Sequence, residues 1–386
     1  MKYTLLLLSL LFLLTGCGAA PEPVPETAQP VMNIVEETLP PVTEPETQAT
    51  EPVDPLEFLL GIMSTEYKVG QLFLARCPAD MAVEDVKTYH LGGYVLFGRD
   101  FHGKTPETLS AKLWEYQVAS SIPMLIAVDE EGGTVCRVSN YKAFRSDPFA
   151  SPRSLYAADG MDAVLAAEEE KAALLQSLGI NVNLAPVCDI TTTPGAFLYS
   201  RSLGQSPEIT GDFVAGAVEI MQDHQVGSVL KHFPGYGDQG DTHTGTAVDS
   251  RTLEQLESAD LIPFQRGIDA GCGAVMVSHN TVKAFDETLP ASLSPAVHAY
   301  LREEMGFHGV IMTDDLDMGA ITNHYSPAEA AVLAVLAGND ILCTTEYRVQ
   351  YPAVLEAVKS GRISMELLDE AVMRILRWKQ ALGLMY

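Results

Sequence analysis

Eight short runs of apolar and β-branched residues recur along most of this 386-residue chain, and their regular spacing is its strongest constraint on fold. The runs are 70–77, 93–97, 123–129, 180–189, 227–232, 274–279, 309–314 and 340–344. Between most of them lie amphipathic stretches of helical period, at 106–120, 163–178, 206–224, 253–270, 294–305 and 327–337. Alternating strands and helices predict a parallel sheet, and eight strands in one domain predict an α/β fold of the (β/α)8 TIM-barrel type.

An open, doubly wound sheet is the alternative arrangement of the same elements. Its dinucleotide-binding form has a Gly-x-Gly-x-x-Gly motif in the first strand-helix unit, and the sequence lacks this motif there. The last stretch, 364–382, carries apolar residues near one helical face. We expect it to pack on the barrel exterior or to close the barrel's bottom. The prediction is therefore a single barrel domain at 55–386.

The first residues of the chain do not fit this domain. One lysine and a short apolar run precede the motif Leu-Thr-Gly-Cys at 14–17. This motif resembles the bacterial lipobox, in which the cysteine is acylated and becomes the mature N-terminus, and the run is too short to be a good membrane span. We expect a lipoprotein signal peptide at 1–16 and a lipidated Cys17, with a plain anchor or cleaved signal as the alternative. The expected location is the outer face of the cell membrane, after export.

The segment after the cysteine is acidic and rich in proline. Residues 19–54 contain eight acidic residues and no lysine or arginine. Because such a segment cannot bury a core, we expect 17–54 to consist of the lipidated cysteine and a disordered linker. The whole chain has a formal net charge of −27 at pH 7, and nucleic-acid binding would require a basic face. We therefore expect no nucleic-acid partner.

Charged side chains stand at the carboxyl ends of several predicted strands. They are Asp129, Lys231, His232, His279 and Asp314. In a (β/α)8 barrel these strand ends meet at one rim, which is where the active sites of this fold lie. We therefore expect these side chains to gather around one site.

The loop that follows Lys231 and His232 is rich in glycine and carries Asp241 and His243 two residues apart. A carboxylate in this position can hold the imidazole in one tautomer, as required of a histidine that acts as a general acid and base. A carboxylate nucleophile together with a separate proton donor is what retaining glycoside cleavage requires. The pattern therefore favours a glycosidase.

A metal site is the alternative use of these residues. His232, His243, His279 and Asp241 could be ligands, but the sequence has no His-x-x-x-His or His-Glu-x-x-His helix. The cysteines other than Cys17 include no Cys-x-x-Cys pair. We expect no metal, no cofactor and no disulfide framework.

Several segments in the right order resemble the β-N-acetylhexosaminidase branch of glycoside hydrolase family 3. Lys-His-Phe-Pro-Gly at 231–235 resembles the signature of that branch, and Val-Asp-Glu-Glu-Gly-Gly-Thr-Val-Cys-Arg at 128–137 resembles a second motif. Tyr-Ser-Arg-Ser-Leu-Gly at 199–204 is similar to its Arg-Ser-Phe-Gly, and Thr-Asp-Asp-Leu-Asp-Met at 313–318 to its nucleophile segment. The resemblance covers roughly 60–384.

This resemblance implies a cofactor-independent, exo-acting barrel enzyme. It would hydrolyse terminal β-linked N-acetylglucosamine from cell-wall-derived or other amino-sugar glycans, through a covalent glycosyl-enzyme. The family pattern implies Asp314 as the nucleophile, His243 as the acid and base, and Asp241 as the residue that orients it. It implies that the sugar is bound by Asp129, Arg137, Arg201, Lys231 and His232. Oligomeric state is left open.

Three features depart from the family pattern. Tyr236 stands where a histidine is usual, Thr134 replaces an arginine, and the loop between Gly237 and Asp241 is one residue short, with Thr242 in place of serine. None removes a catalytic group, but they bear on the reach of the loop and on the preferred leaving group.

Four alternative functions remain open at this point. A family 3 phosphorylase would transfer the sugar to phosphate, since a histidine acid repels an anion less than a carboxylate does. A β-glucosidase would take its acid from a second domain. Hydrolysis assisted by the substrate's acetamido group would use an acidic pair such as Asp129 and Glu130. A sugar-binding lipoprotein is the non-enzymatic alternative.

Overall fold

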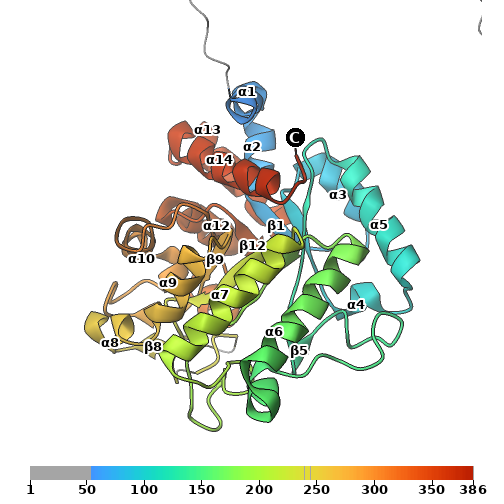
Figure 1. Cartoon of the computed structure of the whole chain (residues 1–386). Helices are drawn as coiled ribbons and strands as arrows, with labels where there is room; N and C mark the ends of the chain where they lie inside the picture. Colours follow the sequence, from blue (N-terminus) through green and yellow to red (C-terminus); the bar gives the residue numbers. More distant parts are fainter. Residues whose placement is uncertain (1–53, 239, 244, 386) are drawn as a thin grey trace, which may run out of the picture. The chain divides into compact units, whose positions relative to one another are not determined.

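The computed structural model describes residues 54–238, 240–243 and 245–385, and these form the predicted α/β barrel (Figure 1). Eight parallel strands lie in the order β11-β9-β7-β6-β3-β2-β1-β12, and a bridge between Met312 and Ile341 makes the barrel nearly closed. The strands are β1 (Phe73–Arg76), β2 (Gly93–Leu96), β3 (Leu125–Val128), β6 (Val182–Asn183), β7 (Gly227–Phe233), β9 (Ala274–Val277), β11 (Val310–Thr313) and β12 (Leu342–Thr344). The predicted signal peptide, Cys17 and nearly all of the linker lie outside the described residues.

Helices surround the strands. They are α1 (Pro55–Ile62), α2 (Thr65–Gln71), α3 (Ala82–Tyr89), α4 (Gly98–Phe101), α5 (Pro106–Ala119), α6 (Pro152–Leu178), α7 (Pro207–Asp223), α8 (Leu253–Glu257), α9 (Leu261–Asp269), α10 (Pro295–Ala299), α11 (Gly319–Thr322), α12 (Pro327–Ala337), α13 (Tyr347–Lys359) and α14 (Met365–Ala381). A 3-10 turn, η1 (Ala291–Leu293), precedes α10, and a π-helical turn, η2 (Tyr300–Glu304), follows it.

Ser-Pro pairs begin three of the long helices. The hydroxyls of Ser151, Ser206 and Ser326 accept a backbone N–H from the first turn, and proline occupies the first helical position. Proline fits there because its missing N–H would have no partner within the helix. These pairs fix the starts of α6, α7 and α12.

The structure departs from the predicted boundaries in places. The predicted strand 180–189 is regular only over Val182–Asn183, because Pro186 has no N–H to donate to a neighbour and the segment continues only as an isolated bridge from Val187 to Lys231. The predicted helix 253–270 is two helices, α8 and α9.

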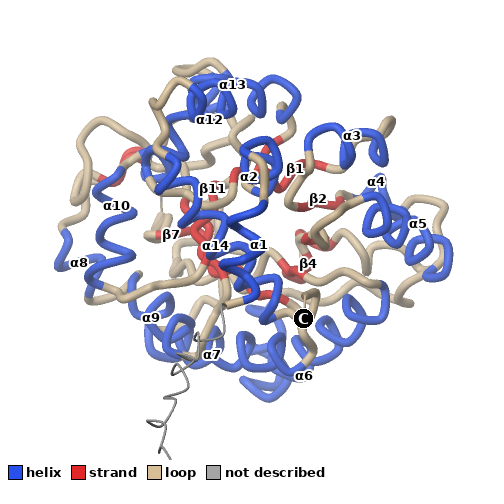
Figure 2. The backbone as a smooth tube through the Cα atoms, turned by 90° about the horizontal axis from the view of Figure 1, so that it is seen from above, coloured by secondary structure: helices blue, strands red, loops and turns tan. Residues whose placement is uncertain are grey.

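The last helix closes the end of the barrel at which the strands begin. Figure 2 shows α14 lying with α1 and α2 over the strands. The Trp378 ring packs where Gly227 and Gly273 start their strands, and a Cβ atom on either glycine would lie within 2.7 Å of that ring. The helix α14 therefore covers this end of the barrel, and the carboxyl ends of the strands form the opposite rim. No helix in the described parts of the chain is long and apolar enough to cross a bilayer.

Two small sheets lie at the opposite rim of the barrel. β4 (Glu130–Gly132) and β5 (Val135–Cys136) form an antiparallel hairpin directly after β3. β8 (Val248–Asp249) and β10 (Thr281–Val282) pair in parallel.

Candidate active site

A cavity of about 380 Å³ opens at the carboxyl ends of the strands. Seven of the eight barrel residues predicted for the site line it together: Asp129, Arg137, Arg201, Lys231, His232, His243 and Asp314. The eighth, Asp241, is bonded to His243. Strands far apart in sequence thus bring the predicted residues to one place, as the barrel rule requires.

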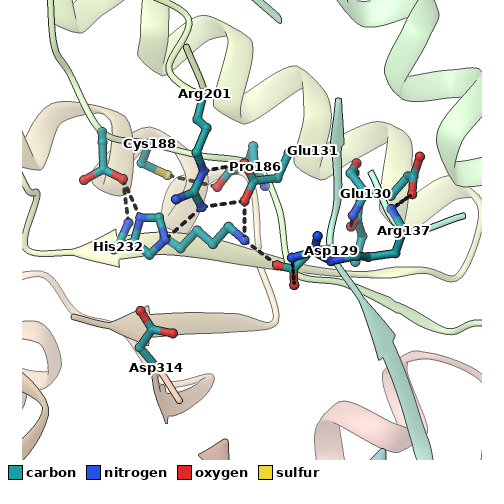
Figure 3. Close-up of polar contacts among 12 residues, drawn as sticks. Asp129, Glu130, Glu131, Arg137, Pro186, Cys188, Arg201, His232 and Asp314 are labelled. Atoms are coloured by element: carbon teal, nitrogen blue, oxygen red, sulfur yellow. Dashed lines mark hydrogen bonds and ion pairs between the residues drawn. The ribbon is translucent and has the colours of Figure 1, made fainter. Parts of the chain in front are cut away.

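A chain of alternating charges forms one wall of the cavity (Figure 3). Lys231 Nζ lies 2.7 Å from Asp129 Oδ1 and 2.6 Å from Glu131 Oε1. Arg201 donates two hydrogen bonds to the Glu131 carboxylate, at 2.9 and 2.7 Å. The Arg137 guanidinium lies 3.9 Å from Asp129 Oδ2. Asp129 is thus held between two cations, with its carboxylate at the cavity surface.

The buried members of this chain remain charged. Burial alone would raise the pKa of Glu131, but Lys231 and Arg201 outweigh it and hold that pKa well below its usual range. Burial would lower the pKa of Lys231, but Asp129 and Glu131 outweigh it and raise that pKa. Buried charges are tolerated when each has a partner, and here each partner is fixed by a second bond.

Asp189 organises the neighbouring segment. Its carboxylate accepts hydrogen bonds from the backbone N–H of His232 at 3.0 Å, from the backbone N–H of Tyr236 at 2.7 Å, and from His232 Nδ1 at 2.7 Å. The ring nitrogen that remains, His232 Nε2, lies 3.3 Å from Arg201. Asp189 therefore orients the imidazole toward the cavity without lining it.

Asp189→Ala is expected to destabilise the fold by about 3–5 kcal/mol, because it leaves three buried donors without their acceptor. The midpoint of urea unfolding measures this. Asp223→Ala, at an exposed aspartate at the end of α7, is the matched control, and its effect should stay within about 0.5 kcal/mol. Equal midpoints for the two variants would contradict the role given to Asp189.

Asp314 follows β11 directly and faces the cavity below the charged wall (Figure 3). Burial would raise the pKa of Asp314, but His232, His279, the backbone N–H of Asp315 and Lys231 together lower it. The amide contact is a hydrogen bond of 2.8 Å to Asp314 Oδ1. Asp314 is therefore an ionised carboxylate at neutral pH, as a nucleophile must be.

The adjacent Asp315 also lines the cavity, but its electrostatics differ. Burial raises the pKa of Asp315 to about 7, reinforced by the carboxylates of Asp317 and Asp314 and opposed by a hydrogen bond from the Asp317 amide. At neutral pH this group is partly protonated. Two neighbouring carboxyls with separated pKa values point to separate roles, and the ionised one is Asp314.

The Asp241–His243 pair stands on an exposed loop. The Asp241 carboxylate lies 2.6 Å from His243 Nδ1 and accepts the His243 backbone N–H at 2.9 Å. The His243 side chain is 58% exposed, and its ring lies 5.9 Å from that of Phe197. With Nδ1 bonded to Asp241, Nε2 is the nitrogen available to a substrate.

Backbone contacts dock this loop against the segment that follows Asp314. The N–H of Gly319 donates to the His243 carbonyl at 3.3 Å, and the N–H of Ala320 donates to the Thr242 carbonyl at 3.1 Å. The loop that carries the candidate acid is thus attached to the segment that carries Asp314.

Two of the departures from the family pattern contact each other. The buried Tyr236 hydroxyl is hydrogen-bonded to the hydroxyl of Thr242. Thr134 lines the cavity. Tyr236 and Thr242 thus form a hydrogen-bonded pair within the loop.

Two rim residues considered from the sequence do not face the cavity. The Glu130 carboxylate is buried and accepts the backbone N–H groups of Arg137 and Val138, each at 2.8 Å, which holds the hairpin (Figure 3). His279 is buried, with Nδ1 2.7 Å from the Ser292 hydroxyl and Nε2 3.0 Å from the Asp315 carbonyl. Among the residues that the structure describes, no three His, Cys, Asp or Glu side chains are placed to hold one metal ion.

Sequence reasoning missed Glu131, Asp189 and Arg76. Glu131 lies inside the matched motif at 128–137, so its place in the motif was the only available signal. Asp189 ends a predicted strand, as Asp129 and Asp314 do, and the strand-end rule could have included it. Arg76, the last residue of β1, lines the cavity and satisfies the same rule.

A model of the glycosyl hydrolase family 3 N-terminal domain matches residues 64–378. The chain belongs to glycosyl hydrolase family 3. A beta-hexosaminidase of Stenotrophomonas maltophilia is 37% identical over 238 residues, which cover 60% of this chain and 69% of the relative. The beta-hexosaminidase LpqI of Mycobacterium tuberculosis is 31% identical over 338 residues, 83% of this chain and 84% of the relative.

The solved structures give the same assignment to family 3. A family 3 beta-N-acetylglucosaminidase from Paenibacillus sp. superimposes with a TM-score of 0.78 at 34% identity. The superposition covers 83% of this chain and 63% of that chain, so this chain spans less than two thirds of it. The family 3 match and these relatives make the protein a glycoside hydrolase, as its motifs predict.

Proposed function

We propose that this protein is a retaining, exo-acting β-N-acetylglucosaminidase that hydrolyses terminal β-linked N-acetylglucosamine from cell-wall-derived or other amino-sugar glycans. The observation that carries the proposal is an ionised Asp314 at a sugar-sized cavity whose rim holds the Asp241–His243 pair. The hexosaminidases among its relatives support the choice of sugar.

In the first step of the proposed reaction, an Asp314 oxygen attacks the anomeric carbon and the glycosidic bond breaks. His243 Nε2 gives its proton to the departing oxygen, while Asp241 stabilises the ring through Nδ1. In the second step, neutral His243 takes a proton from water as the water oxygen attacks the same carbon. The bond to Asp314 then breaks, which returns both residues to their starting states.

The remaining predicted residues are proposed to bind the sugar. Asp129 accepts hydrogen bonds from sugar hydroxyls, and Lys231 and Arg201 supply donors from the same wall. His232 presents Nε2 beside Arg201. Arg137 lines the opposite side of Asp129, and its Nε is buried without a partner among the described residues. A rigid, charged wall positions the sugar over Asp314 before reaction.

Release of 4-nitrophenol from its N-acetyl-β-glucosaminide tests the activity. Hydrolysis should proceed in phosphate-free buffer and yield N-acetylglucosamine with the β configuration first. Turnover that requires phosphate and gives a sugar 1-phosphate would favour the phosphorylase. Binding without turnover would favour a sugar-binding protein. Glu130 is not free to assist the acetamido route, because its carboxylate is occupied in the hairpin.

The same proposal places the enzyme outside the cell membrane. We propose that residues 1–16 are a lipoprotein signal, that Cys17 carries the lipid, and that the acidic linker at 18–54 holds the barrel domain away from the surface. A lipid chain on Cys17 supplies membrane affinity that the apolar signal run is too short to supply.

Cys17→Ala is expected to release the protein from membranes or to leave its signal uncleaved. Fractionation of cells and mass spectrometry of the N-terminal peptide measure both results. Cys272→Ala, a change at a buried cysteine of the barrel, should keep the membrane fraction unchanged. A Cys17→Ala protein that still partitions fully with membranes would contradict lipid attachment.

A further inference from the structure

A second cavity, of about 330 Å³, adjoins the sugar site. Arg76 lines both cavities, so the two share a wall. The second cavity lies between the ends of β1 and β12 and is lined by three arginines, Arg76, Arg99 and Arg348. In a chain with a net charge of −27, such a cluster beside a sugar site requires an explanation.

Arg76 is the least compensated of the three. Its guanidinium lies over the ring of Phe97, 4.3 Å from the centroid, and its Nε is buried without a hydrogen-bond partner. Among the described residues, no carboxylate lies within 4 Å of its charged nitrogens as an ion pair. Stacking fixes the plane of the guanidinium, and the side chain lines both cavities.

The other two arginines have one acidic neighbour each. Arg99 donates to the Cys77 carbonyl, and its Nε lies 3.8 Å from Asp100. Arg348 donates to Asp85. Their side chains are 45% and 49% exposed, so both guanidinium groups remain accessible to a ligand. A guanidinium has more N–H donors than these contacts use.

Two further residues of the lining limit what the second cavity can bind. Glu346 is the acidic side chain in the lining, and Tyr347 contributes a buried ring beneath Arg348. Within the lining, three arginines stand against this one acid, whereas Asp100 and Asp85 contact Arg99 and Arg348 from outside it. Planar, forked donors of this kind match the two oxygens of a carboxylate.

We infer that Arg76, Arg99 and Arg348 form a subsite for an acidic group on the leaving group of the substrate. This inference rests on the proposed function. An exo-acting enzyme holds the terminal sugar in the first cavity, so the rest of the substrate is by definition the leaving group. A carboxylate carried by it would otherwise be repelled by the acidic protein, and a local cluster of cations removes that penalty.

Two donors that differ by one charge test the inference. They are 4-nitrophenyl N-acetyl-β-glucosaminide and the same donor with a carboxylate on the aryl ring. The ratio of kcat/KM for the charged over the neutral donor is expected to fall about tenfold in Arg76→Gln, and by a similar factor in Arg99→Gln and Arg348→Gln. Arg362→Gln is the matched control, because its side chain is 45% exposed and it pairs with Glu329 away from both cavities.

The outcomes separate this inference from the proposed function. A ratio that is the same in the wild type and the three variants, or that falls as much in Arg362→Gln, overturns the subsite. Acceleration by inorganic phosphate with formation of a sugar 1-phosphate, lost in the same variants, also overturns it, because the arginines would then bind free phosphate. Failure of the wild type to cleave either donor overturns the proposed function itself.

Discussion

Asp314→Asn is expected to lower kcat by at least about 10³-fold while the protein stays folded and still binds the sugar. The amide cannot form the glycosyl ester, yet it has nearly the same size as the carboxylate and can still accept the Asp315 N–H. Steady-state kinetics measure the loss, and equilibrium binding of N-acetylglucosamine measures the retained site. Asp317→Asn, in the same segment but outside the cavity lining, is the control and should keep most turnover.

Covalent trapping identifies the nucleophile directly. A 5-fluoro or 2-deoxy-2-fluoro glycosyl donor should inactivate the wild-type enzyme and leave the sugar on the peptide that contains Asp314. The neighbouring Asp315 is the alternative attachment point, but its pKa of about 7 leaves it partly protonated at neutral pH. An adduct on another residue, or normal turnover with no adduct, would overturn the assignment and restore the acetamido-assisted route.

His243→Ala is expected to slow cleavage of a natural disaccharide by about 10²–10⁴-fold. Cleavage of a dinitrophenyl glycoside should change far less at the glycosylation step, because a good leaving group needs little protonation. Single-turnover kinetics on the two substrates separate this step from later ones. Equal losses on both substrates would show that His243 is not the acid.

Asp241→Asn should give the same pattern with a smaller loss. The amide can still contact Nδ1 but no longer stabilises the charged ring with a full negative charge. Comparing the losses of disaccharide cleavage in the two variants, with the larger loss expected for His243→Ala, therefore tests whether Asp241 acts through His243.

The fold and most of the site follow from rules that apply to single strands. Asp129, Lys231, His232 and Asp314 each end an apolar run, and parallel strands carry such ends to one rim whatever the helices between them do. The Asp-x-His spacing is equally local, because a side chain reaches the residue two positions on without help from the rest of the fold. The sequence therefore predicts that these residues lie at one rim, and the structure places them around one cavity.

Of the residues that were missed, Arg76 and Asp189 end strands and satisfy the same rule, whereas the role of Glu131 depends on contacts between distant segments. Asp129, Glu130 and Glu131 are consecutive acids, and only the position at which β3 ends and β4 begins decides which of them faces the cations. Neighbouring side chains along a strand point to opposite sides, so Glu130 turns into the hairpin and Glu131 toward Lys231. For Asp189, the sequence could not show the role, since its partners lie more than 40 residues away.

The docking of the loop that carries Asp241 and His243 has one more consequence. The amide groups of Gly319 and Ala320 belong to the first turn of α11, where a helix supplies no acceptor of its own, and their acceptors are the His243 and Thr242 carbonyls. Their hydrogens are therefore protected from exchange with deuterated water only while the loop is docked. The rate of hydrogen exchange at these two amides therefore measures how often the loop opens in the absence of substrate. Comparing this rate with kcat would show whether opening of the loop limits each catalytic cycle.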